Sequence, residues 1–180
     1  MTEPPKGFDR TVRLRDGRVA LIRPLTRQDA PELGEAIRTA DPVTLRRRFC
    51  GTAPRVTPRL LERLTALDYQ RRFALVARSP SGHGVAIGRY EATATPGVAE
   101  ISLAVTPDWR RAGLASALVQ FLGEAALTRG FDRFTAVYFA DNRPVTELLD
   151  NAGGRQVIAK GLAEAEVLLR TAQAQSMRAW

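Results

Sequence analysis

Hydrophobic and polar positions alternate along several short stretches of the chain, and a period of two is typical of half-buried β-strands. Residues 11–15 and 18–25 flank the dipeptide Asp16-Gly17, which predicts a tight β-hairpin at the start of the fold. Three later stretches, 73–78, 85–94 and 98–105, are separated by turns rich in Ser, Gly and Pro. They predict successive antiparallel strands.

Other segments carry apolar residues three or four apart, which is the spacing of an amphipathic helix. Three helices are predicted before the central strands, each beginning at an N-capping residue: Thr26, Asp41 and Thr57. The clearest helix pattern covers 114–129, where Leu114, Leu118 and Leu122 form one stripe and Gly130 follows. This helix is expected to pack its stripe against the sheet.

The remaining pattern predicts a strand over 134–139, a helix over 144–152 and a final strand pair over 155–170 that turns near Gly161. The order of elements favours a single α+β domain over residues 11–170. Residues 1–10 are expected to form a flexible N-terminus, and residues 171–180 a frayed C-terminal tail. Whether the protein is a monomer or a homodimer stays open.

The chain has 180 residues with one cysteine, Cys50, and one histidine, His83. A single cysteine cannot form an internal disulfide, and these two residues cannot assemble a Cys/His metal cluster, so no metal is expected. His83 lies in a Ser/Pro/Gly-rich stretch that predicts an exposed turn, which argues against a Ser-His-Asp or Cys-His mechanism.

The net charge of +8 is compatible with nucleic acid, an anionic cofactor or an acidic protein partner. No known nucleic-acid-binding motif accompanies the arginines, so nucleic acid is not the expected partner. The longest uncharged stretch, 112–123, is well short of the roughly 18 residues that a membrane span needs, and residues 1–10 lack the apolar core of a signal peptide. We therefore expect a cytoplasmic protein that is not bound to a membrane.

The segment 98–116 reads VAEISLAVTPDWRRAGLAS, which is a strand, a short arginine-bearing loop and the start of the long helix. The first N–H groups of a helix have no acceptor within it, and the helix dipole is positive there. The amides of residues 111–116 are therefore expected to hold a pyrophosphate, with Gly113 and Ala115 allowing close approach. Arg110 and Arg111 would add charge-assisted contacts.

The pattern R-x-x-G-x-A at Arg110, Gly113 and Ala115 resembles the acetyl-coenzyme-A motif of the GNAT N-acetyltransferase superfamily. Asn142-Arg143-Pro144-Val145, with Leu148-Leu149 and Gly153, resembles the second motif of that superfamily. The resemblance implies the GNAT fold, with a mixed, mostly antiparallel sheet, and acetyl-CoA as co-substrate. It implies these cofactor-binding residues: Leu103, Ala104, Val105, Arg110, Arg111, Ala112, Gly113, Leu114, Ala115, Ser116 and Asn142.

Upstream segments such as Thr44-Leu45, Arg48-Phe49 and Asp68-Tyr69 resemble the Pat-type protein lysine acetyltransferases. The resemblance implies direct transfer of an acetyl group from the thioester to an amine, with a lysine side chain of a protein as the expected acceptor. An acidic-surfaced protein such as an acyl-CoA synthetase is the partner that this implies. A small-molecule amine, or a non-catalytic acyl-CoA-binding module, remains an alternative.

Glu100 is the candidate general base, because it is the acidic residue of strand 98–105 and matches the base position of several superfamily members. Its apolar neighbours are expected to bury the carboxylate. Burial disfavours the charged form of a carboxylate, which makes it a stronger proton acceptor. The alternative is an outward-facing strand residue, because Glu100 alternates with Ile101 and Leu103.

The chain departs from the superfamily pattern at Leu149, where many members place a tyrosine that protonates the leaving thiolate, and at Gly154, where an aromatic residue is usual. Tyr90 and Tyr138 are interpreted as core residues, so no general acid is assigned. Asp68, with Tyr69 and Glu91, is a weaker candidate for lining an acceptor pocket.

Overall fold

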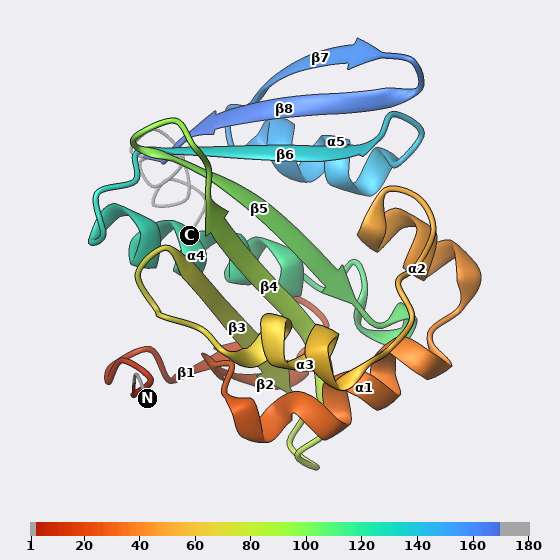
Figure 1. Ribbon diagram of the computed structural model, residues 1–180, viewed down its shortest axis with the longest axis vertical. Coiled ribbons are helices and arrows are strands. Elements are labelled where there is room, and N and C mark those ends of the chain that lie inside the picture. Colours follow the sequence, from red (N-terminus) through yellow and green to blue (C-terminus); the bar gives the residue numbers. More distant parts are fainter. Residues whose placement is uncertain (1–2, 170–180) are drawn as a thin grey trace.

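The centre of the fold is an eight-stranded sheet in the order β1-β2-β3-β4-β5-β6-β8-β7 (Figure 1). Neighbouring strands are antiparallel except β5 and β6, which are parallel. The strands are β1 (Arg10–Arg13), β2 (Val19–Pro24), β3 (Arg72–Arg78), β4 (Gly84–Ala92), β5 (Val98–Val105), β6 (Arg133–Phe139), β7 (Arg155–Ala159) and β8 (Leu162–Leu168). This computed structural model describes residues 3–169, so the predicted tail 171–180 lies outside the described residues. The α+β class and the mostly antiparallel sheet are confirmed.

Helices cover both faces of the sheet (Figure 1). They are α1 (Ala30–Thr39), α2 (Pro42–Phe49), α3 (Pro58–Thr65), α4 (Leu114–Leu127) and α5 (Arg143–Asn151), with short 3-10 helices η1 (Arg27–Asp29) and η2 (Pro107–Trp109). Gly88 on β4 lets α4 approach closely: a Cβ at this position would lie 2.9 Å from Leu122 Cδ1 and 2.8 Å from Leu103 Cδ2. Leu103 therefore faces α4. Side chains alternate along a strand, so Glu100, three residues before Leu103, faces away from α4.

The predicted hairpin is present, but its turn is longer than expected. Leu14 N donates to Arg18 O (2.8 Å), so Arg15, Asp16 and Gly17 form a three-residue loop instead of a two-residue turn. Among these loop residues, Gly17 has a positive φ of +85°, as expected for a type I turn that ends in a left-handed residue. The extra loop residue places Arg15 at the tip of the hairpin.

Two of the three predicted helix starts, at Asp41 and Thr57, are confirmed by their capping groups. Asp41 Oδ1 accepts from Thr44 N (2.9 Å), and Thr57 Oγ1 accepts from Leu60 N (3.1 Å). At Thr26 the helix opens with the single turn of η1, because the Asp29 carboxylate accepts from Thr26 N (2.8 Å) and ties this turn tightly.

The N-terminal segment contacts the core through Phe8, whose ring lies 5.1 Å from that of Phe73. Phe73 in turn stacks on Tyr90 (5.7 Å), a fully buried side chain of β4. The flexibility expected for residues 1–10 stays a prediction. No helix within residues 3–169 has the length and apolar character to cross a bilayer.

Candidate functional site

The site begins where β5 and β6 separate. β5 pairs with β4 from Ala99 to Val105, whereas its pairing with β6 covers only Val98 to Glu100. Figure 1 shows the two strands leaving a common end and diverging. Beyond Glu100, β5 therefore has an edge that β6 does not cover.

The register identifies which backbone groups lie on this edge. Thr106 N donates to Val85 O (3.0 Å), so the backbone groups of Thr106 face β4. Backbone groups alternate in direction along a strand, so those of Ala104 face β4 as well. Those of Ile101 and Leu103 face the opposite side, towards the opening. A ligand with amide groups can pair with this edge as an added strand does.

The chain after β5, residues 106–113, forms the loop predicted to bind pyrophosphate, the phosphate loop. Two of its residues have positive φ, Arg111 (+60°) and Gly113 (+92°), and Gly113 is the N-cap of α4. Ala117 N donates to Gly113 O (3.1 Å), and the three preceding helical amides, Leu114 to Ser116, point out of the N-terminus without an acceptor inside the helix. This is the geometry predicted for pyrophosphate binding.

The two arginines of the motif take different positions. Arg110 Nε donates to Val105 O (3.1 Å), and its Nη2 donates to Thr44 Oγ1 of α2 (2.8 Å). Arg110 therefore ties the loop to α2, and its guanidinium is already engaged by the protein. Arg111 is exposed. Of the pair, it is the residue whose charge is available to a phosphate.

Helix α2 spans the opening between β5 and β6 (Figure 1). At its first turn, Thr44 bonds to Arg110 as described above. At its last turn, the Arg46 guanidinium lies 4.0 Å from the centre of the Phe139 ring, and Cys50 Sγ donates to Val137 O (3.2 Å). α2 thus connects the phosphate loop to β6 and covers the opening on the face opposite α4.

Glu100 lies where the β5–β6 pairing ends, directly across from Glu91 of β4 and Thr135 of β6. Its side chain is exposed, so the burial expected from its apolar neighbours is wrong. Those neighbours alternate to the α4 face of the sheet, and Glu100 faces the α2 side, where solvent reaches it. A carboxylate in this position can exchange protons with water.

Two arginines of the same face share the surroundings of Glu100. Burial, followed by the charge of Arg89, lowers the pKa of Arg48 to about 10, while Cys50 and Glu100 act in the opposite direction. Arg48 stays charged at neutral pH. Burial also lowers the pKa of Arg89, which bonds to Glu91 Oε2 (3.2 Å). Apart from the resemblance at Arg48-Phe49, no local pattern in the sequence marks these two arginines, because only the fold brings α2 and β4 to Glu100.

Cys50 is a free thiol beside the opening. Burial, and then the negative charge of Glu100, raise its pKa, so the thiol stays protonated at neutral pH. A protonated thiol is a poor nucleophile. This agrees with a reaction in which no covalent intermediate forms on the protein.

Asn142 occupies the carboxyl end of β6, as the phosphate loop occupies the carboxyl end of β5. It is buried, begins α5 as its N-cap, and its backbone oxygen accepts from Val145 N (3.0 Å) and Thr146 N (3.1 Å). Because β5 and β6 are parallel, both predicted motifs lie at the same end of the separated strands. The structure therefore brings the two motifs to one opening.

The family model of the acetyltransferase (GNAT) family matches residues 44–153, a range that includes both motifs and the separated strands. The chain belongs to the GNAT acetyltransferase family. The fold and the family expected from the sequence are confirmed.

Among known proteins, this GNAT acetyltransferase is similar to acetyltransferase PA5475 of Pseudomonas aeruginosa, with 33% identity over 138 residues, 75% of this chain and 74% of that one. The GNAT domain of S. lividans PAT superposes with a TM-score of 0.84 and 29% identity, covering 92% of this chain and 99% of that chain. RimJ of Mycobacterium smegmatis, solved with CoA-disulfide, shares the fold at a TM-score of 0.73 and 19% identity, covering 95% and 93%.

The tyrosines of this GNAT domain do not reach the opening. Tyr90 donates to Gln70 O (3.1 Å), and burial raises its pKa far above the ordinary value. Tyr138 bonds to Gln156 of β7. Leu149, where many family members place a tyrosine, is buried. Both tyrosines are core residues with bonded hydroxyls, as predicted from the sequence.

Gly154 follows the end of α5, and its backbone leaves no space for a side chain. A Cβ there would lie 2.8 Å from Leu149 O and 3.2 Å from Val167 Cγ2. The absence of an aromatic residue at this position therefore has a steric reason in this chain.

Gly154→Ala is expected to lower the free energy of unfolding by about 1–3 kcal/mol, because the backbone oxygen of Leu149 cannot move aside as a side chain can. Urea unfolding measures the change. Gly51→Ala is the control, since the nearest atom to its Cβ, Phe49 O, is 4.0 Å away. An equal loss in both variants would contradict the steric reason.

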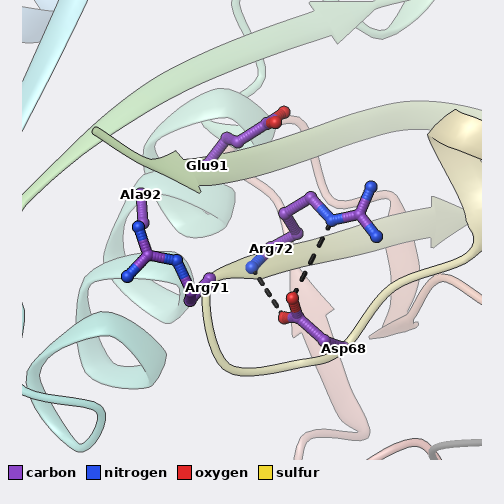
Figure 2. Close-up of a pocket in the computed structure, with 5 residues that line it drawn as sticks. All are labelled: Asp68, Arg71, Arg72, Glu91 and Ala92. Carbon is purple, nitrogen blue, oxygen red and sulfur yellow. Dashed lines mark hydrogen bonds and ion pairs between the residues drawn. The ribbon is translucent and has the colours of Figure 1, made fainter. Parts of the chain in front are cut away.

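A hollow lies at the carboxyl end of β4, lined by Asp68, Arg71, Arg72, Glu91 and Ala92 (Figure 2). Burial raises the pKa of Asp68, but the backbone N–H groups of Arg72 (2.8 Å) and Gln70 (2.9 Å) outweigh it, and the pKa lies below its usual value. Asp68 thus closes a turn, while Glu91 connects the hollow to Glu100 across the strand pair. Tyr69 is not part of it: this side chain is buried and donates to Leu25 O (2.9 Å).

Within residues 3–169, no group of three or more His, Cys, Asp or Glu side chains is arranged to hold a metal ion. His83 is exposed in a turn in which Ser79 N donates to His83 O (2.9 Å). The charged groups around Glu100 include Glu91, Arg48 and Arg89.

Proposed function

We propose that this GNAT protein is an acetyl-CoA-dependent N-acetyltransferase that transfers the acetyl group directly to an amine, with a protein lysine side chain as the acceptor. The observation that carries this proposal is the opening where β5 and β6 separate. It brings together the unpaired amides of α4, the unpaired edge of β5 and the exposed carboxylate of Glu100. Acetyl-CoA has a diphosphate, amide groups and a thioester in the corresponding order.

The residues present fit this co-substrate. The amides of Leu114, Ala115 and Ser116 are oriented to bind its diphosphate, and Gly113 lets the phosphate approach the backbone. The free edge of β5 at Ile101 and Leu103 can bond to its amide groups. Acetyl-CoA supplies an activated acetyl thioester, and the protein supplies orientation and proton transfer.

Glu100 is proposed as the general base. A lysine ammonium with a pKa of about 10.4 is mostly protonated at pH 7, and removing its proton costs about 4.6 kcal/mol. Glu100 can accept this proton, directly or through one water molecule. The neutral nitrogen then attacks the thioester carbon, the C–S bond breaks, and the sulfur leaves as a thiolate. The second proton of the nitrogen passes to water as the amide forms, and the thiolate can take up a proton from water.

No protein acid is assigned to the thiolate. The hydroxyls of Tyr90 and Tyr138 are bonded elsewhere, and a thiol with a pKa of about 8.5 is a stable enough leaving group to depart without a protonated partner. We therefore expect both substrates to be bound together, since the described residues offer no activated nucleophile to hold the acetyl group in between.

A protein lysine is supported by the resemblance to Pat-type lysine acetyltransferases and by the similarity to the GNAT domain of S. lividans PAT over 92% of this chain. The exposed position of Glu100 also suits an acceptor on the surface of a large partner. A small-molecule amine would use the same base and the same opening.

The test incubates the purified chain with acetyl-CoA and soluble bacterial proteins, and in parallel with spermidine and putrescine. Acetyl-lysine is detected by mass spectrometry, and thiol release by a colour reagent. The expected result is acetyl-lysine on folded proteins, formed far more slowly with Glu100→Gln. Thiol release with the polyamines alone would replace the lysine proposal with a small amine. Calorimetric binding of acetyl-CoA without thiol release in any mixture would indicate a non-catalytic module.

A further inference from the structure

The tip of the N-terminal hairpin is docked on the phosphate loop. Arg15 N donates to Ala112 O (3.1 Å), and Arg18 Nη1 donates to Asp108 O (2.9 Å). The Arg18 guanidinium also lies 4.4 Å from the centre of the Trp109 ring. A backbone bond, a side-chain bond and a cation–π contact thus fix the hairpin against the loop, although the two segments are far apart in the sequence.

The side chain of Arg15 lies along Gly113, the N-cap of α4. Its Cγ, Nε and Cδ atoms are 3.7, 3.8 and 3.9 Å from the position that a Cβ on Gly113 would occupy. The Nε atom of the guanidinium is therefore beside Gly113, the residue directly before the first helical amide of α4. Gly113 has room for this contact because it has no side chain of its own.

The two arginines of the hairpin differ in their partners. Arg18 is bound by the Asp16 carboxylate as well as by Asp108 O. The Arg15 side chain is exposed, and its guanidinium has no hydrogen-bond or ion-pair partner within the part of the chain that the structure describes. Arg18 is thus an anchor, whereas Arg15 presents an uncompensated charge.

We propose that Arg15 is a ligand for a phosphate group of coenzyme A, delivered to the site by the hairpin. Arg15 and Arg111 place two unpaired positive charges around amides that have no acceptor in the helix. A phosphate group can pair with both the arginines and the amides. An arginine donates two parallel N–H groups to its oxygens, and the helix amides donate further hydrogen bonds. The inference rests on the proposed use of acetyl-CoA.

Coenzyme A has phosphate groups at two places, the diphosphate and the 3′-phosphate of its ribose, and both have the chemistry that Arg15 recognises. Acetyl-dephospho-CoA lacks only the 3′-phosphate. Comparison of the two compounds therefore identifies which phosphate Arg15 contacts.

The experiment measures the dissociation constants of acetyl-CoA and acetyl-dephospho-CoA by calorimetry, at one fixed salt concentration, for the full chain and its variants. Arg15→Ala is expected to weaken acetyl-CoA binding about tenfold. Arg13→Ala removes the same charge from an exposed position of the same hairpin and is the matched control. Its affinity is expected to stay within about twofold of the unmodified chain.

The dephospho compound separates the two phosphates. If Arg15→Ala weakens acetyl-CoA but not acetyl-dephospho-CoA, Arg15 contacts the 3′-phosphate; if it weakens both, Arg15 contacts the diphosphate. Either result supports the proposal. Equal affinities of Arg15→Ala and Arg13→Ala for acetyl-CoA would overturn it.

Arg15→Lys guards against a folding defect, because it keeps the charge and loses the paired donors. An affinity between those of the unmodified chain and Arg15→Ala is expected, and an affinity at or below that of Arg15→Ala would also overturn the proposal. If the unmodified chain bound no acetyl-CoA, the proposed function itself would fail. Normal binding with no effect of Arg15 would leave the proposed function standing and remove only this inference.

Discussion

Glu100→Gln is expected to lower kcat at pH 7 by a factor of about 10²–10⁴, the range that a positioned general base contributes. The dissociation constant of acetyl-CoA should stay the same, because Glu100 lies at the far end of the uncovered edge from the phosphate loop. The difference in kcat should shrink as the pH approaches 10.4, where a lysine amine loses its proton without help. Thiol release at saturating acetyl-CoA, measured from pH 7 to 10.5, checks both expectations.

Glu91→Gln is the control for this experiment. Glu91 is the cross-strand partner of Glu100 on the same face of the sheet, so the variant removes the same charge beside Arg89. We expect its kcat to change only a few-fold, because its carboxylate is held by the Arg89 guanidinium. Equal losses of kcat in the two variants would show that the negative charge on this face of the sheet matters, and that Glu100 does not act as a base. Unchanged turnover in Glu100→Gln would remove Glu100 from the catalytic role.

Gly113→Ala is expected to weaken acetyl-CoA binding at least about tenfold and to leave kcat at saturation nearly unchanged. At φ +92° a Cβ is strained by about 1–2 kcal/mol, and relaxation of the backbone would turn the amides of Leu114 and Ala115 away from the diphosphate. The atom nearest to the Cβ position, Arg15 Cγ, is 3.7 Å away, which is an ordinary contact distance. The effect therefore comes from the backbone and not from a clash. Calorimetry with acetyl-CoA measures it.

Gly130→Ala is the matched control at the other end of α4. Gly130 has a φ of +84° and no atom within 4 Å of its Cβ position, so the strain is comparable while the phosphate loop is untouched. Both variants should lose similar stability in thermal unfolding, and only Gly113→Ala should lose affinity. A similar loss of affinity in both variants would mean that strain acts through stability alone, and the loop would lose its assigned role.

Much of the fold could be predicted from local patterns. The strand over 98–105 and the helix that begins at Leu114 were expected at the residues where the structure has them, since alternation and helical spacing report which face of each element is buried. The caps at Asp41 and Thr57 were predictable for a similar reason, because a side chain bonds to an amide three residues away.

The hairpin turn and the burial of Glu100 were predicted less well. Asp16-Gly17 favours a two-residue turn, but the loop takes in Arg15 because its amide bonds to Ala112 O of the distant phosphate loop. Apolar neighbours in the sequence suggested that Glu100 is buried. They lie on the opposite face of β5, so they shield the α4 side and leave the carboxylate exposed.

Local patterns are enough to define the elements and to locate the motif proposed to bind phosphate, because strand alternation, helix caps and a glycine before a helix act over a few residues. The tertiary structure decided where β6 leaves β5, that Arg110 ties the loop to α2, and that Arg15 and Arg48 reach the site from distant segments. These contacts depend on the packing of elements far apart in the chain, and the pattern of one segment contains no information about the partner that it meets.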